Sequence, residues 1–387
     1  MVCARRLSLF VFIDALGWEL SQRHAFLDGL TTVRSPLATI FGYSSTCDPT
    51  ILTGKLPREH GHFAFFTYNP AQSPFRHYRM LRVLPKSIMD RGRIRGKLSR
   101  VMKRFHGYTG YFQLYNMPFE HLHLFDYSEK RSLFEPGGIN SGAPTIFDVL
   151  REHGIPFSRS ESFSETASIA RLEAGIDRGE VTFAYLFFGA LDGVLHAQGT
   201  RASAVSEHIR WYEERLTRLV DRAARQYEAV RLFVFSDHGM TDITGTCDLM
   251  RRIDRLGLRF GVDYAAVYDS TMARFWFLTG TARERIEAAL REEPQGRILS
   301  EEQLAEWGCD FPHHEYGELF FLLHPGVLLC PSFMGARPLA AMHGYEPQDQ
   351  DSVACFLSNV PVAPLPRRLE DLYDVMRREA LQGRGAQ

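Results

Sequence analysis

Residues 230–237, VRLFVFSD, form a short run of β-branched and aromatic residues that ends in an acid. Two further runs have the same character: residues 7–14, LSLFVFID, and residues 181–192, VTFAYLFFGALD. Runs that are almost continuously apolar are typical of strands buried on both faces of a parallel sheet. The three runs therefore predict the central strands of such a sheet.

The segments between these strands have helical spacing. In residues 203–229 apolar side chains recur every three or four positions, and residues 144–154 begin with proline and end with glycine, as helices commonly do. Strands that alternate with helices predict an α/β fold with a doubly wound, mostly parallel sheet flanked by helices. Ligands of such sheets bind at the carboxyl ends of the strands, where we expect Asp14, Asp192 and Asp237.

The composition excludes several classes of protein. The 387 residues include 45 Lys+Arg and 46 Asp+Glu, without the basic excess of a dedicated nucleic-acid-binding protein, so we expect no specific nucleic-acid partner. The six cysteines are scattered without a CxxC motif, which favours reduced thiols and a cytoplasmic location. The apolar run of residues 7–13 is short and is followed by Asp14, so we interpret it as a strand rather than a signal peptide.

Two stretches depart from the alternation of strands and helices. Residues 75–105 hold eleven Lys/Arg and one acid among apolar positions, and residues 251–335 mix helical and strand-like patterns. The basic stretch is either a solvated helical insertion or a rim that attracts a phosphorylated substrate or an anionic membrane. We predict a catalytic core of residues 1–74, 136–250 and 336–378, a basic insertion at 75–135, a cap insertion at 251–335 and a frayed tail at 379–387.

Six residues of metal-ligand type are separated along the chain. Asp14 ends the first run, Asp192 and His196 form D-x-x-x-H, Asp237 and His238 are adjacent, and His343 lies in the segment MHGYEP. Each residue alone is as readily a helix cap or a structural histidine. Together, three carboxylates and three imidazoles suit two divalent metal ions, zinc above all, with manganese or iron as alternatives.

Another segment, GYSSTCDPTILTG at residues 42–54, supplies hydroxyl groups before an expected helix. A hydroxyl at a helix N-terminus lies near unpaired N–H groups and the positive end of the helix dipole, which suits an alkoxide and an anionic substrate. The alternative is a plain Ser or Thr N-cap. The candidate nucleophiles are Ser44, Ser45 and Thr46.

In this order along the chain, the ligand residues and the hydroxyl segment resemble the alkaline phosphatase superfamily, most closely its type I phosphodiesterase/nucleotide pyrophosphatase branch. That branch has a nucleophilic Thr or Ser ten residues before the glycine of a TG pair, followed by P-x-x-H-G and Y-D-P. Counting back from Gly54 reaches Ser44, and residues 57–61 and 68–70 are PREHG and YNP. A shift of register would exchange Ser44 for Ser45 or Thr46.

The resemblance implies a division of labour at the site. One metal ion would be held by Asp192, His196 and His343, and the other by Asp14, Asp237 and His238, with Ser44 bound to the second. Ser44 would attack phosphorus, and water would then hydrolyse the phosphoseryl enzyme. Such activation is needed because a hydroxyl is a poor nucleophile at neutral pH.

The chain departs from the branch at Phe65, which stands where the branch usually has an asparagine whose amide donates to a phosphoryl oxygen. Phenylalanine cannot donate, so that donor is missing or comes from elsewhere. Phe65 is instead a candidate for lining a leaving-group pocket, and the alternative is that its aromatic run belongs to the core. We expect a two-metal-dependent phosphoesterase that acts on a small phosphorylated substrate, a phosphodiester or pyrophosphate. The alternatives are a phosphomonoesterase or phosphonate hydrolase of the same fold, and a non-catalytic binding module that retains the fold.

Overall fold

The computed structural model describes residues 6–83, 92–160 and 164–382. Residues 84–91 of the predicted basic insertion and residues 383–387 of the predicted tail lie outside the described residues. None of the helices described is long and apolar enough to cross a membrane.

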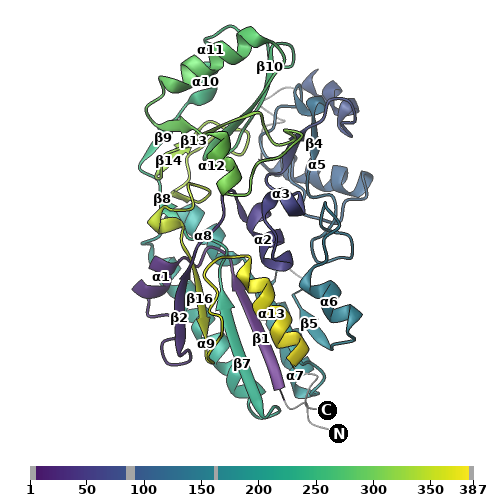
Figure 1. Ribbon diagram of the computed structural model, residues 1–387, viewed down its shortest axis with the longest axis vertical. Helices are drawn as coiled ribbons and strands as arrows, with labels where there is room; N and C mark the ends of the chain where they lie inside the picture. The colour runs from purple at the N-terminus through teal and green to yellow at the C-terminus, as the bar shows by residue number, and fades with distance from the viewer. Residues whose placement is uncertain (1–5, 84–91, 161–163, 383–387) are drawn as a thin grey trace.

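The central sheet occupies the lower half of the molecule in Figure 1 and has the strand order β2-β16-β7-β1-β6-β5. Its strands are β1 Arg6–Ile13, β2 Val33–Leu37, β5 Phe157–Arg159, β6 Phe183–Phe188, β7 Ala229–Phe235 and β16 Ala354–Ser358. β5, β6, β1 and β7 pair in parallel, and β16 is antiparallel to both of its neighbours. The predicted doubly wound, mostly parallel sheet is confirmed, and residues 7–13 lie in its central strand.

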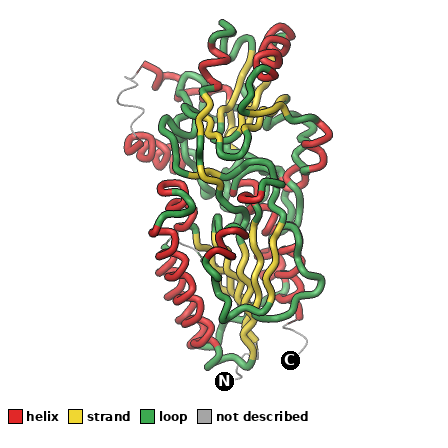
Figure 2. The backbone as a smooth tube through the Cα atoms, turned by 90° about the vertical axis from the view of Figure 1, so that its left-hand side faces the viewer, coloured by secondary structure: helices red, strands yellow, loops and turns green. Residues whose placement is uncertain are grey.

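Helices cover both faces of this sheet because successive side chains of a strand point to opposite sides. Leu9, Val11 and Ile13 of β1 pack on one face, where Figure 2 shows a long helix, with α7 Glu165–Asp177, α8 Ala190–Gln198 and α9 Ser203–Ala223. Phe10 and Phe12 point to the other face and pack with α2 Ser44–Thr53, α6 Ile146–Glu152 and α13 Asp371–Gln382.

The two predicted helices are present and shorter than their sequence patterns. α9 ends at Ala223 instead of residue 229, because the chain must turn before it enters β7 at Ala229. α6 begins after Thr145, whose side chain accepts a hydrogen bond from the N–H of Asp148 and caps the helix.

The upper half of the molecule is built around the antiparallel sheet β10-β11-β13-β12. Its elements are β10 Tyr264–Tyr268, β11 Met272–Phe277, α11 Gly280–Arg291, β12 Gly296–Ile298, α12 Glu301–Glu306 and β13 Leu319–Leu323. Against it lie β3 Phe66–Tyr68, η1 Arg76–Val83, α5 Gly92–Phe105, η2 Leu122–Leu124, β4 Phe125–Tyr127 and α10 Leu249–Asp254. One hydrophobic cluster contains residues of both predicted insertions, such as Phe112 and Phe275, so the two insertions pack against each other.

The remaining short elements are α1 Trp18–Arg23, α3 Pro57–His60, β8 Thr241–Asp242, β9 Gly245–Cys247, β14 Val327–Leu329, β15 Ala341–Met342 and η3 Gln350–Ser352. β9 pairs with β14, so the upper half begins near Gly245, before the predicted boundary at residue 251.

The prediction of a frayed tail from residue 379 is wrong for the described part of the chain, because α13 continues to Gln382. Glu379 is buried against the central sheet, where it pairs with Arg6 and accepts hydrogen bonds from Ser8 and Arg231. These contacts hold the last turns of the helix against β1 and β7.

Candidate active site

The first group of candidate ligands, which we call the acidic cluster, consists of Asp14, Asp237 and His238. Asp14 follows β1 and the other two follow β7, so the parallel pairing of these strands brings their carboxyl ends together. The ligand atoms of the three residues lie within 4.8 Å of one another. His238 Nε2 is 2.9 Å from Asp237 Oδ2 and 3.7 Å from Asp14 Oδ1.

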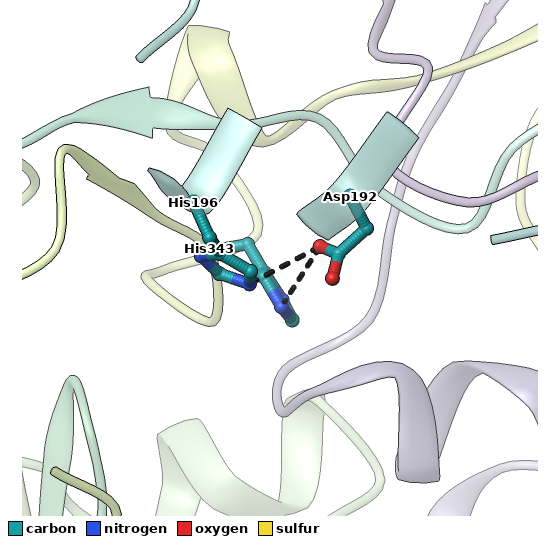
Figure 3. Close-up of side chains that lie close together, drawn as sticks. All are labelled: Asp192, His196 and His343. Carbon is teal, nitrogen blue, oxygen red and sulfur yellow. Dashed lines mark ion pairs between the residues drawn. The ribbon is translucent and has the colours of Figure 1, made fainter. Parts of the chain in front are cut away.

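The second group, which we call the imidazole cluster, consists of Asp192, His196 and His343, and its ligand atoms also lie within 4.8 Å of one another. Figure 3 shows both imidazoles converging on the Asp192 carboxylate, whose Oδ1 is 3.2 Å from His196 Nε2 and 3.8 Å from His343 Nε2. His343 comes directly after β15.

The structure corrects the expected position of Asp192 at a strand end. β6 ends at Phe188, and Asp192 lies in the first turn of α8 with His196 one turn later. Residues four apart on a helix share one face, which is why the D-x-x-x-H spacing presents both side chains together.

The two clusters touch, because the rings of His238 and His343 stack with centroids 3.7 Å apart and an interplanar angle of 9°. Burial raises the pKa of Asp14 well above its ordinary value, and the charges of Asp237 and Asp192 add to this effect. Burial also lowers the pKa of His343, as do the neighbouring His238 and His196. The charges of the two clusters therefore act on one another.

Two of the imidazoles are oriented for ligation. His238 Nδ1 lies 2.9 Å from the carbonyl of Gly239, and His196 Nδ1 lies 2.8 Å from that of Ala341. A carbonyl only accepts, so each Nδ1 donates and each Nε2 is left facing the carboxylates. This is the arrangement that second-shell acceptors impose on metal-binding histidines.

Several buried polar atoms of the clusters have no hydrogen-bond partner among the described residues: Asp14 Oδ1, Asp192 Oδ1, Asp237 Oδ2 and His343 Nδ1. Unpaired buried carboxylates are costly unless a positive charge compensates them. Three carboxylates and three imidazoles converging in this way can accommodate divalent cations.

Among the three candidate nucleophiles, only Ser44 contacts a cluster. Its Oγ lies 3.1 Å from His238 Nε2. Ser45 Oγ donates to the carbonyl of Phe63 at 3.1 Å, and buried Thr46 Oγ1 donates to the same carbonyl. All three residues lie within the first turn of α2, rather than before the helix as expected.

Phe65 lies among tyrosine rings. It stacks on Tyr115 and Tyr127, with ring centroids 5.8 and 5.6 Å apart, and packs on Tyr111 at 5.3 Å. The hydroxyls of Tyr111 and Tyr115 are hydrogen-bonded to each other at 2.8 Å. Burial raises the pKa of both hydroxyls, and Asp192 contributes to both shifts.

Neither this tyrosine pair nor Asp48 is among the candidate residues expected from the sequence. Asp48 lies one turn after Ser44 in α2, and burial raises its pKa well above the ordinary value, with Asp237 and Glu129 adding to the shift. Asp48 lies four residues after Ser44, so the sequence already places the two on one face of a helix, whereas the tyrosines lie in an insertion without a recognisable motif.

Comparisons with known proteins agree with this geometry. Residues 9–308 match the family model described as type I phosphodiesterase/nucleotide pyrophosphatase. The human ectonucleotide pyrophosphatase/phosphodiesterase 5 structure is similar in fold, with a TM-score of 0.68 and 13% identity, covering 97% of this chain and 95% of that chain. Its murine counterpart has a TM-score of 0.66 and 15% identity, with the same coverage. An inactive form of the murine protein in complex with AMP has a TM-score of 0.68 and 15% identity.

A search among curated proteins yields no match. At these identities the solved structures show the fold alone, and the family model carries the assignment because it spans most of the chain. The chain belongs to the type I phosphodiesterase/nucleotide pyrophosphatase family, whose members are hydrolases that act on phosphoric ester bonds.

Proposed function

We propose that this protein is a two-metal-dependent phosphodiesterase that acts through a phosphoseryl intermediate at Ser44. The observation that carries the proposal is the Ser44 hydroxyl, 3.1 Å from His238 Nε2 and beside two ligand clusters that touch. The family assignment supports hydrolysis of a phosphoric ester bond.

The residues of the acidic and imidazole clusters fit divalent cations, because their buried carboxylate oxygens lack hydrogen-bond partners and two of their imidazoles are fixed through Nδ1. Mixed carboxylate and imidazole ligands favour zinc, with manganese or iron as alternatives. When bound, the cations would lower the pKa of a neighbouring hydroxyl and offset negative charge on the phosphoryl oxygens.

In the proposed reaction, Ser44 Oγ gives up its proton and forms a bond to phosphorus while the bond from phosphorus to the leaving oxygen breaks, and the leaving oxygen takes up a proton. α2 begins at Ser44, so the positive end of its dipole stabilises negative charge on the nucleophile and on the phosphoryl group. Water then attacks the phosphoserine ester, and Ser44 regains its proton as its Oγ leaves phosphorus.

The tyrosine pair is the proposed source of the hydrogen bond that Phe65 cannot donate. Two hydroxyls carry two protons, and the bond between Tyr111 and Tyr115 uses one of them. The raised pKa of each hydroxyl keeps both protonated at neutral pH. We therefore propose that the second proton is donated to a substrate oxygen on the side of the imidazole cluster.

A phosphodiester or pyrophosphate is the proposed substrate class. The AMP complex of the murine structural neighbour supports a nucleotide or a related ester. The rings of Phe65, Tyr111 and Tyr115 offer an aromatic surface to the leaving group. The cysteines of the described residues are free thiols, which supports the proposal that the protein works in the reducing cytoplasm.

The test is chelation followed by addition of metal. We expect dialysis against EDTA to abolish hydrolysis of bis-p-nitrophenyl phosphate and added Zn²⁺ or Mn²⁺ to restore it, with two metal ions per chain in the active protein. Preference for p-nitrophenyl phosphate would favour the monoesterase alternative. Activity that ignores EDTA would overturn the two-metal proposal, and binding without turnover in the metal-loaded protein would favour a non-catalytic module.

A further inference from the structure

The three most exposed large apolar side chains of the described residues lie on two neighbouring elements of the basic insertion. They are Met80 in η1 and Val101 and Phe105 in α5, which are 78%, 64% and 78% exposed. Single exposed apolar residues are ordinary on a protein surface, but an exposed apolar group within one region usually marks an interaction site. We call this region the docking face.

The opposite side of α5 fixes the helix against the rest of the upper half. Arg95 donates to the carbonyl of Met117 and stacks on Phe119, and Ser99 accepts from the N–H of Leu114. Val101 and Phe105 lie one helical turn apart and therefore point to the same, outer side. Figure 1 shows α5 at the outer edge of the upper half.

η1 and α5 are joined at the docking face. Tyr78 of η1 contacts the residue that follows α5, because its hydroxyl lies 3.1 Å from His106 Nε2. This contact brings the region of Met80 to the end of the helix that carries Phe105. The two basic elements therefore meet at the end of α5 that carries Phe105.

Basic side chains surround these apolar residues, and neither η1 nor α5 contains an acidic residue. The exposed ones are Arg76 and Arg79 of η1 and Arg93, Lys97, Arg100 and Arg104 of α5. Lys97, Val101 and Phe105 follow one another at intervals of four, so one cationic and two apolar groups share the outer side of the helix.

We propose that the docking face binds the surface of an anionic phospholipid bilayer. Basic groups complement lipid phosphates, while Val101 and Phe105 enter the boundary between headgroups and acyl chains. A nucleic acid would satisfy the charges but would leave the apolar side chains in water, so lipid fits both features. Contact of this kind is peripheral, and it does not depend on the proposed catalytic function.

The test measures binding of the full chain to vesicles of phosphatidylcholine alone and of phosphatidylcholine with phosphatidylglycerol. We expect binding only to the anionic vesicles, weakening as salt rises because surface charge is screened. Replacing Val101 and Phe105 together by serine is expected to weaken binding about tenfold or more, since burial of a single large apolar side chain contributes more than tenfold. Lys97→Gln is expected to weaken it about fivefold, the effect of one cation near an anionic surface.

The matched control replaces Leu365 by serine, because Leu365 is an exposed apolar residue between β16 and α13, in the half of the molecule that holds the central sheet. That variant is expected to bind vesicles as the native protein does. All variants should keep the native melting temperature and the native turnover of a soluble phosphodiester, which shows that they are folded. Equal binding to uncharged vesicles, absence of binding, or unchanged binding of the Val101/Phe105 double variant would each overturn the proposal. Binding to duplex DNA as strong as to anionic vesicles and insensitive to the double variant would overturn it in favour of a nucleic-acid surface.

Discussion

The acidic cluster and the imidazole cluster are in contact through the stacked rings of His238 and His343, but they differ in charge and in the elements that hold them. The acidic cluster has two carboxylates and one imidazole and is held by the ends of two adjacent parallel strands. The imidazole cluster has one carboxylate and two imidazoles, and it joins one turn of α8 to a residue that lies far along the chain. The acidic cluster is therefore expected to depend more strongly on a bound cation than the imidazole cluster does.

Charge explains the difference. Each ionised carboxylate contributes one negative charge, and a neutral imidazole contributes none. The formal charge is therefore about −2 for the acidic cluster and about −1 for the imidazole cluster. Asp237 is fully buried and Asp14 nearly so, whereas Asp192 is partly exposed. Buried like charges repel strongly. Ser44 contacts the acidic cluster, which places the candidate nucleophile beside the greater concentration of negative charge.

The largest expected effect tests whether the nucleophile belongs to the acidic cluster. Ser44→Ala is expected to lower kcat for a phosphodiester by roughly a thousandfold or more, the scale of losing a catalytic nucleophile. Metal content should stay unchanged, because Ser44 is outside both triads. The measurement pairs steady-state kinetics with metal analysis.

Ser45→Ala is the matched control for this prediction, since Ser45 donates to the Phe63 carbonyl instead of facing a cluster. It should retain most of the turnover. If Ser44→Ala were active and Ser45→Ala inactive, Ser45 would be the nucleophile, and the nucleophile would not contact the acidic cluster.

The second prediction sets the carboxylates of the two clusters against each other. In EDTA, Asp14→Asn is expected to stabilise the fold, because it removes one of two buried like charges; the change should lie within the roughly 0.5–3 kcal/mol common for single substitutions. Asp192→Asn is expected to destabilise it, because Asp192 is the carboxylate that faces His196 and His343. Urea unfolding with and without Zn²⁺ measures both.

With Zn²⁺ present, Asp14→Asn should lower the free energy of unfolding instead of raising it, because a ligand of a stabilising cation is lost. Each variant is expected to bind about one metal ion fewer per chain than the native protein. If Asp14→Asn and Asp192→Asn shift stability in the same direction in EDTA, the contrast between the clusters is wrong.

The third prediction concerns the tyrosine pair, Tyr111 and Tyr115, which packs on Phe65. Tyr115→Phe and Tyr111→Phe are each expected to lower kcat by about tenfold to a hundredfold, somewhat below the loss of a full oxyanion-hole donor. KM and metal content should change little. Tyr127→Phe is the control, because Tyr127 also stacks on Phe65 but its hydroxyl accepts from Gln113 N–H rather than joining the pair. An equal loss of kcat in all three variants would show that the tyrosines act through ring packing on Phe65 and not through a hydrogen bond donated to the substrate.

The smallest expected effect concerns Glu129, which accepts a hydrogen bond from the N–H of Tyr111 at 2.9 Å. Burial raises the pKa of Glu129 to about 7, despite the lowering influence of that hydrogen bond and of Lys103. The folded state therefore favours the protonated form, and the stability associated with Glu129 is lost as pH rises from about 4.5 through about 7.

Glu129→Gln keeps the acceptor for Tyr111 and removes the charge. It should be more stable than the native protein at pH 8 and nearly equal to it at pH 4.5, as measured by urea unfolding at both values. A difference of the same size at both pH values would show that the titration of Glu129 does not affect stability.

Much of the site could be predicted because its chemistry is local in sequence. Asp237 and His238 are neighbours, Asp192 and His196 have helical spacing, and each pair follows a recognisable apolar run. His343 has no such partner nearby in the sequence, and only its combination with the other five residues made it a candidate ligand. The tyrosine pair could not be predicted, because Tyr111 and Tyr115 reach Phe65 through packing between segments about fifty residues apart in sequence.

The choice among Ser44, Ser45 and Thr46 shows where sequence reasoning stopped. All three offer a hydroxyl, and counting from Gly54 depends on an alignment without gaps. The structure separates them because successive residues of a helix point about 100° apart. Only the direction of Ser44 meets His238, while the other two hydroxyls meet the Phe63 carbonyl.

The sequence by itself determined the sheet, the six candidate ligands and the family, because apolar runs and short spacings encode strands, helix faces and strand ends locally. Tertiary structure alone decided that the two groups of ligands touch, which hydroxyl faces them and what surrounds Phe65. It also decided that the two insertions share one core and that the chain remains helical to Gln382. These features depend on contacts between distant segments, which form only when burial of apolar surface brings those segments together.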